Sequence, residues 1–251
     1  MPRNILALTV LTVLSTSLTS ALPHWPHERS TATPTLTVPL LSGLPTPPAG
    51  LTLKYVALCL GTQNYSCPST TTTGASSASS SSPTSTSPQT PTPIPIGALA
   101  TLYDATHLLL STSVLDPAAL PALTHSLPCL ADALNMSLGL PFLGHHYFDG
   151  LSRPTFDLTA ASPPAFLSAK KVADVPAPVG TGLQQSCKGR DGAAAVDWLM
   201  LEDCGDGLSR GGVSVAYRVE TAGGKAVGVC AAGQMGEVVV SDYAAEYWFY
   251  G

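Results

Sequence analysis

The sequence has few charged residues, few aromatic residues and, beyond its first twenty-odd positions, no long apolar run. Charged side chains make up 11% of the 251 residues. An average soluble domain has about 25%, so this composition argues against a charge-laced helical bundle or coiled coil. Only 11 Lys and Arg stand against 16 Asp and Glu. We therefore expect no basic surface for nucleic acid.

The N-terminus has the pattern of a secretory signal peptide. Arg3 is followed by an apolar stretch at 5–18, and small residues suit cleavage after Ala21. Residues 1–21 are therefore predicted to be a signal peptide, and 22–37 a Pro- and Thr-rich leader. No later segment approaches the roughly 20 apolar residues of a membrane span. We expect a secreted, extracellular protein that has no membrane contact after cleavage and whose single domain covers 38–251.

The chain has six cysteines, which matters because the export route is oxidising. An even number of cysteines in a secreted chain predicts up to three disulfides, although 15 pairings are possible. No two of them have C-x2-C spacing, so we expect no metal site. The six are Cys59, Cys67, Cys129, Cys187, Cys204 and Cys230.

Two features indicate glycosylation. Asn64 and Asn135 begin Asn-x-Ser sequons, and Asn135 is the better candidate because Asn64 lies beside Cys67 at the end of a predicted strand. Residues 68–95 hold 9 Ser, 8 Thr and 6 Pro. Such a tract cannot bury a core, so we predict a disordered or extended insertion within one domain. It is either a carrier of O-linked sugars or a tolerated surface insertion.

The remaining foldable segments are short and separated by Gly and Pro, a pattern typical of strands. One Ala-rich region at 116–134 is predicted to contain a short helix. The sequence therefore predicts an all-β fold, an antiparallel sandwich or barrel with short helical segments. The predicted strands are 51–60, 98–103, 145–148, 196–201, 213–219, 227–230, 238–240 and 243–250.

An ordered set of motifs runs through this foldable part of the chain. They are GTQNYSC at 61–67, ALATLYDAT at 98–106, HHYF at 145–148, PTF at 154–156, VDWLML at 196–201, YRVETAGG at 217–224, Cys230 and YAAEYWFY at 243–250. Together they resemble the DUF3455 family, whose fungal members are secreted proteins often labelled "malate dehydrogenase". The resemblance covers roughly residues 38–251. It implies a disulfide between Cys67 and Cys230, because both positions match the family's motifs.

The dehydrogenase label has little support in the residues. Dinucleotide binding needs a Gly-x-Gly-x-x-Gly turn between a strand and a helix, and the nearest match, at 180–185, lacks the third Gly. We therefore expect no cofactor. The Gly-x-Ser-x-Gly match at 207–211 resembles a hydrolase nucleophile turn, but no His follows it in the chain. A Gly-rich hairpin turn is the favoured interpretation.

The candidate site residues lie on three predicted strands. His146 could act as a general base, although a hydrogen-bonded structural His is the favoured interpretation. Glu246 shares one strand face with Trp248 and Tyr250, and this face is either a sugar-binding aromatic surface or buried, with Glu246 paired to Arg218 or Lys225. The favoured hypothesis is a secreted, disulfide-bonded glycoprotein that binds cell-wall polysaccharide or a small extracellular ligand. The alternative is an extracellular hydrolase or oxidoreductase that uses His146 with Glu246 or Asp197.

Overall fold

The computed structural model describes residues 36–40, 42–69, 91–110, 121, 123–126, 139–178, 194–226, 228 and 230–251. The predicted signal peptide, most of the leader and most of the insertion lie outside these residues. Asn135, Cys129 and Cys187 do so too, as does the segment at 180–185.

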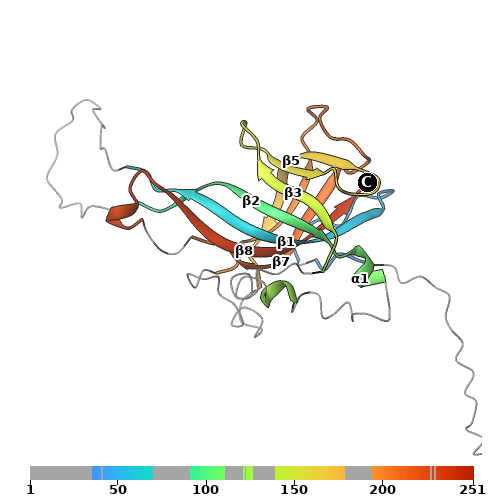
Figure 1. Ribbon diagram of the computed structural model, residues 1–251, viewed down its shortest axis with the longest axis horizontal. Coiled ribbons are helices and arrows are strands. Elements are labelled where there is room, and N and C mark those ends of the chain that lie inside the picture. Colours follow the sequence, from blue (N-terminus) through green and yellow to red (C-terminus); the bar gives the residue numbers. More distant parts are fainter. Residues whose placement is uncertain are drawn as a thin grey trace, which may run out of the picture. The chain divides into compact units, whose positions relative to one another are not determined.

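Eight antiparallel strands form a closed barrel (Figure 1). Each strand pairs with the next along the chain, and β8 pairs with β1, so the sheet formed by the described strands closes on itself. This confirms the predicted all-β antiparallel fold and, of the two architectures that the sequence allowed, selects the barrel. The strands are β1 Leu53–Ser66, β2 Ile94–Asp104, β3 Phe142–Phe148, β4 Pro154–Leu158, β5 Ala165–Val175, β6 Trp198–Asp203, β7 Val215–Gly223 and β8 Val238–Tyr250.

Several predicted strand boundaries were wrong. β4 and β5 were not predicted, because β4 is short and begins with Pro, while β5 carries two adjacent lysines that hide its apolar alternation. Residues 238–240 and 243–250 form one strand, β8. Of the predicted strand 227–230, the described residues Gly228 and Cys230 are not in a strand. Ile94 and Pro95, assigned to the insertion, belong to β2, which pairs with β1 up to Ser66.

Alternation along the strands creates two apolar clusters, one on each side of the barrel wall. In β8, Tyr247 and Phe249 point into the barrel, whereas Ala244 and Trp248 belong to the outer cluster. The outer cluster includes Val38 and Leu44 of the segment that precedes β1. From Tyr243 to Tyr250, both faces of β8 are therefore buried. The largest fully buried side chains inside the barrel are Leu102, Leu143, Phe156, Leu158, Leu167, Tyr243, Tyr247 and Phe249.

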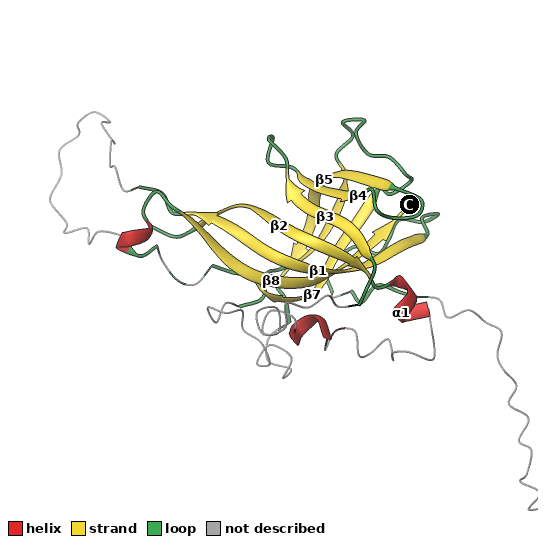
Figure 2. Cartoon of the chain, in the orientation of Figure 1, coloured by secondary structure: helices red, strands yellow, loops and turns green. Residues whose placement is uncertain are grey.

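Helices play a minor part (Figure 2). Helix α1, Thr106–Leu110, follows β2 directly, and the side chain of Asp104 accepts a hydrogen bond from the Thr106 amide at 2.8 Å. Residues 121 and 123–126 are helical and fall within the region at 116–134 that is predicted to contain a short helix. A 3-10 turn, η1 Ala232–Gln234, precedes β8. No helix among the described residues is long and apolar enough to cross a membrane.

The two ends of the barrel differ. At the end where β1 starts, apolar side chains such as Leu143, Leu158 and Phe249 fill the interior. At the other end, β1, β2 and β8 extend past the shorter strands, and η1 lies at the tip of this extension (Figure 1). The buried polar side chains of Gln63 and Arg218 lie at this second end, which is called the mouth below.

Candidate functional site at the mouth of the barrel

A cavity of about 450 Å³ lies at the mouth and is lined by residues from six strands and from the connections next to β6, β7 and β2. Apolar contacts come from Phe148, Val196 and Leu199, together with prolines that precede and begin β2. The polar and charged lining residues are Gln63, Tyr65, Thr92, Lys171, Asp174, Asp197, Arg218 and Lys225. A concave, mainly apolar cavity with a few convergent polar groups is typical of small-molecule sites.

Arg218 lies on β7 at an inward-facing position opposite Leu199 of β6. Its Nε and Nη2 donate hydrogen bonds to the backbone carbonyl of Asp197, at 3.1 and 2.8 Å. The guanidinium also contacts the Tyr247 phenol, which is fully buried. Only 8% of Arg218 is exposed. The strand and these partners hold a buried cation at one fixed place in the mouth.

Asp197, one of the candidate catalytic residues, lies in this cavity. Its carboxylate forms an ion pair with Lys225 at 2.8 Å, and its backbone carbonyl accepts the two Arg218 bonds. Its side chain and its main chain therefore organise two different cations.

His146 lies inside the barrel and is 2% exposed. Its ring stacks on Phe156 with a centroid distance of 4.4 Å, and its Nδ1 lies 3.0 Å from the Thr155 carbonyl, so Nδ1 carries the donating hydrogen. Burial lowers the pKa of His146 to about 4, and the nearby positive charge of Arg218 contributes to the lowering. This is the hydrogen-bonded structural histidine that the sequence favoured.

The lowered pKa of His146 leads to a prediction for stability. The unfolded chain binds a proton on this side chain below about pH 6.5, whereas the folded protein does so only near pH 4. Stability is therefore lost as the pH falls through this window, by about 3 kcal/mol in all. His146→Gln keeps a donor for Thr155 but cannot titrate. We expect urea titrations at pH 7 and pH 4 to show a smaller acid loss for His146→Gln than for wild type, with the exposed His145→Gln as control.

Glu246 lies on the outer side of the wall, on the opposite face of β8 from Tyr247. It is 1% exposed and accepts hydrogen bonds from Trp248 Nε1 at 3.0 Å and from the Thr124 hydroxyl at 3.3 Å. Burial raises the pKa of Glu246 to about 7, and the neighbouring Glu220 carboxylate also raises it. Its polar partners are thus Trp248 and Thr124 rather than Arg218 or Lys225.

The three candidate catalytic residues do not form one site. His146 faces the barrel interior, Glu246 is buried under the helical residues 123–126 outside it, and Asp197 lies at the mouth. The barrel wall separates His146 from Glu246, because inward and outward side chains alternate along each strand.

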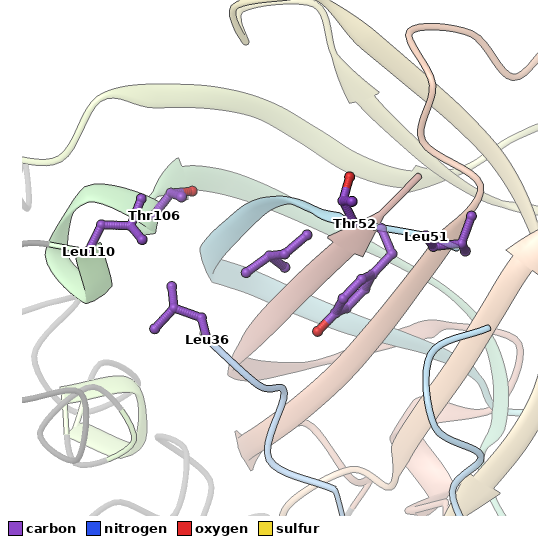
Figure 3. A pocket seen from close by; sticks show the side chains of 7 residues that line it. Leu36, Leu51, Thr52, Thr106 and Leu110 are labelled. Atoms are coloured by element: carbon purple, nitrogen blue, oxygen red, sulfur yellow. The ribbon is translucent and has the colours of Figure 1, made fainter. Parts of the chain in front are cut away.

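The exposed aromatic surface considered for β8 is absent from this strand. Trp248 is 4% exposed and Tyr250 is 6% exposed, because the segment before β1 and helix α1 cover that face of the sheet. The alternative, a strand buried on both faces, is the one observed. Tyr250 does line a second hollow of about 420 Å³ (Figure 3).

This second hollow lies outside the barrel, between the start of β1, α1 and the segment that precedes β1 (Figure 3). Leu36, Leu51 and Leu110 supply apolar walls. The hydroxyls of Thr52 and Thr106 already bond to backbone carbonyls, those of Gly251 and Val56. No charged residue is among the described residues that line it, so the mouth is the better candidate for specific binding.

The disulfide between Cys67 and Cys230 is confirmed. It links the end of β1 to the connection between β7 and β8, which also supplies Lys225 to the mouth. Among the described cysteines, Cys59 and Cys204 are unpaired. Cys59 is fully buried against the Tyr243 hydroxyl at 3.3 Å, and burial raises the pKa of its thiol to about 12, which makes it unreactive.

Two further predicted positions lie on described residues. Asn64 is part of β1 and is partly buried, with its side-chain oxygen accepting a bond from Thr62 at 3.0 Å. Residues 207–211 lie in the connection between β6 and β7, as the hairpin interpretation predicted. Ser209 donates to Asp203 at 2.8 Å.

Asp203, Cys204 and Asp206 bring three potential metal-ligating atoms within 4.8 Å of one another. Asp203 accepts bonds from Ser209 and from the Gly205 amide, while Asp206 accepts one from Ser168 and forms an ion pair with Arg153. The positive charge of Arg153 beside this group opposes a cation, so these residues serve as a network that ties the β6–β7 loop together.

Sequence reasoning missed Arg218 and Gln63 as site residues. A signal was present, because Arg218 interrupts the apolar run of β7 at a position that shares its face with Ala216. A charged residue at an inward position of an apolar strand indicates either a buried pair or a ligand contact. Gln63 carries a similar but weaker signal on β1.

Comparison with known proteins places the chain in a family and goes no further. The model of one protein family, described as "Protein of unknown function (DUF3455)", matches residues 47–251. No curated protein and no solved structure matches the chain.

Proposed function

The chain belongs to the DUF3455 family of proteins of unknown function, and from its geometry we propose that it is a secreted protein that binds a small extracellular ligand at the mouth of the barrel. The observation that carries this proposal is the cavity of about 450 Å³ lined by apolar residues and by the buried Arg218 and Gln63. Small-molecule sites commonly have volumes of about 300–1,000 Å³.

The architecture supports binding at this place. An eight-stranded barrel is just wide enough to be filled by side chains or to hold one small ligand at its open end. Here large apolar side chains fill one end, and the cavity occupies the other. The strands fix the lining residues before a ligand arrives, which lowers the entropic cost of binding.

The geometry favours binding over turnover. The mouth presents Arg218, two lysines paired with aspartates, and an amide, which are groups that hold charge and hydrogen-bonding atoms. His146, the side chain best suited to proton transfer, is enclosed below them and holds the Thr155 carbonyl. A small ligand is favoured over cell-wall polysaccharide, since the side chains of Trp248 and Tyr250 are buried and form no exposed aromatic surface.

Secretion is part of this proposal. The signal-peptide pattern at 1–21, the sequons at Asn64 and Asn135, and the Ser/Thr/Pro-rich tract support it. The Cys67–Cys230 disulfide is consistent with it, because structural disulfides persist in oxidising compartments. Detection of the cleaved, glycosylated protein in culture medium would test this part separately.

Binding at the mouth is tested with two fluorescent probes that share one ring skeleton, neutral N-phenyl-1-naphthylamine and anionic 1-anilinonaphthalene-8-sulfonate. We expect the purified protein to bind at least one of them saturably. Leu199→Trp places a large side chain in the cavity, and we expect it to weaken binding at least tenfold while the circular dichroism spectrum and melting temperature are kept.

The matched control is Leu99→Trp, which adds the same ring at a position that is 59% exposed on β2. It should bind like the wild type. Saturable binding that survives Leu199→Trp would place the probe elsewhere and contradict the proposal. Absence of binding of both probes to the wild type would also contradict it.

A further inference from the structure

We infer that the mouth is selective for an organic monocarboxylate, with Arg218 as the receptor of the carboxylate group and Gln63 as a second donor. This inference rests on the proposed ligand-binding function and names the chemical class of the ligand. It follows from the charge balance of the mouth, from the fixed orientation of Arg218 and from an unpartnered amide.

The charge balance leaves one cation over. Among the described residues that line the cavity, three are cations and two are carboxylates. Lys171 lies 3.0 Å from Asp174, and Lys225 lies 2.8 Å from Asp197, so each lysine has its own partner. Within the described part of the chain, no carboxylate lies within ion-pair distance of Arg218. One positive charge in the mouth is therefore without a counter-charge.

Arg218, the cation without a counter-charge, is also the cation that is buried. The lysine side chains are 54% and 46% exposed, so water solvates them, whereas Arg218 is 8% exposed. A buried cation that has only neutral partners carries a desolvation cost, and an anion placed beside it would offset this cost. The site is therefore biased towards an anionic ligand before any ligand binds.

The orientation of Arg218 suits a carboxylate. Guanidinium has five N–H groups in a planar fork that matches the two oxygens of a carboxylate. The Asp197 carbonyl takes up one edge of the group, through Nε and Nη2, and the Tyr247 phenol contacts it as well. The N–H groups of Arg218 that do not take part in these contacts are held in a fixed orientation by the same partners.

Gln63 supplies the second, independent observation. It faces the cavity from β1, is 8% exposed, and its Nε2 has no hydrogen-bond partner among the described residues. A buried amide without a partner costs free energy, and a ligand oxygen would satisfy it. The apolar surfaces of Phe148, Val196 and Leu199 complete the site and suit the body of the acid. A single excess charge fits a monoacid better than a diacid.

The test uses two competitors of nearly the same size and shape, anionic 2-naphthoate and neutral 2-naphthamide, which displace N-phenyl-1-naphthylamine from the purified protein. A hydrogen bond between a guanidinium and a carboxylate is about twice as strong as one to a neutral amide oxygen, so we expect the wild type to prefer naphthoate by tenfold or more. Arg218→Met removes the charge and retains most of the length, and we expect it to abolish this preference. Binding of the neutral probe to Arg218→Met shows that the mouth is still formed.

Two further variants keep the inference falsifiable. Lys54→Met removes one positive charge from an exposed position at the start of β1, the end of the barrel opposite the mouth, and the preference should survive it. Gln63→Leu should reduce the preference several-fold, and it provides the decisive comparison if Arg218→Met does not fold. A wild type that binds both competitors equally would overturn the inference while leaving the proposed function intact. An unchanged preference in both Arg218→Met and Gln63→Leu would also overturn it, whereas absence of probe binding would instead contradict the proposed function.

Discussion

Replacing both Cys67 and Cys230 by serine is expected to lower the free energy of unfolding by about 2–5 kcal/mol, the range observed when native disulfides are removed. The bond links residues that are 163 positions apart, so it restricts a large part of the unfolded chain. Urea unfolding at pH 7 would measure the loss. Wild-type protein in dithiothreitol should reproduce it.

The matched control is Cys204→Ser, which removes an unpaired, partly exposed thiol. We expect it to change stability by less than about 1 kcal/mol. If the double variant unfolds at the same urea concentration as the wild type, the sheet alone holds this end of the barrel together. Backbone hydrogen bonds would then explain the unchanged stability, because the amide of Cys67 donates to the Glu237 carbonyl and the amide of Cys230 donates to the Pro91 carbonyl.

Loss of the Cys67–Cys230 disulfide is also expected to affect ligand binding at the mouth. Cys230 lies two residues after Gly228, which lines the cavity together with Lys225. Loss of the bond should therefore loosen one wall of the mouth. We expect the double variant to bind the naphthylamine probe more weakly than Cys204→Ser at a urea concentration where both are folded.

Glu246→Gln is expected to stabilise the protein above neutral pH by about 3 kcal/mol. The folded pKa of Glu246 is about 7, above its ordinary value of 4.5, because burial disfavours the carboxylate. Between these two pH values the folded state holds a proton that the unfolded state releases. Below about pH 4.5, Glu246 is protonated in both states and does not lower the free energy of unfolding. As the pH rises from 4.5 to 7, the free energy of unfolding falls.

Gln is close in shape to protonated Glu and can keep the contacts with Trp248 and Thr124. Urea unfolding at pH 4.5 and pH 8 should therefore show similar stability for wild type and variant at the lower pH. At the higher pH the variant should be more stable. Glu237→Gln, at an exposed position, serves as the control and should follow the wild type at both values.

An equal difference between wild type and Glu246→Gln at both pH values would show that Glu246 does not titrate in this window. A less stable variant at pH 8 would show that the ionised carboxylate is well solvated in the folded protein. Either result would contradict the buried position under residues 123–126. The opposite sign predicted for His146 provides an internal check, because acid should destabilise through His146 and base through Glu246.

The strand pattern could be predicted where both faces of a strand are apolar or alternate clearly. β1, β2, β7 and β8 fall in this class, and short runs between Gly and Pro indicated their positions. β5 could not be found in this way, because its second half carries lysines and an aspartate that pair at the mouth. The polar residues of the mouth thus disturbed the pattern that predicts a strand.

The candidate site, like the strands, could be predicted from the sequence only in part. The family motifs identified Cys67 and Cys230, and alternation correctly separated the face of Tyr247 from that of Glu246. Alternation could not tell whether the face of Trp248 and Tyr250 is exposed or buried, because both faces of the strand are rich in apolar residues. The burial of Trp248 and Tyr250 depends on Val38, Leu44 and α1, which approach from distant parts of the chain.

The amino-acid sequence by itself determined an all-β fold, the disulfide through its family motifs, and the family. These properties depend on local alternation, turn residues and ordered motifs, which are visible along the chain. Only the tertiary structure decided between barrel and sandwich, put His146 and Glu246 on opposite sides of one wall, and brought Gln63 and Arg218 into one cavity. Closure of the barrel joins β1 to β8 and brings residues 155 positions apart to the same mouth. Spacing along the chain carries no information about such a contact, because it is made by the pairing of strands that are distant in sequence.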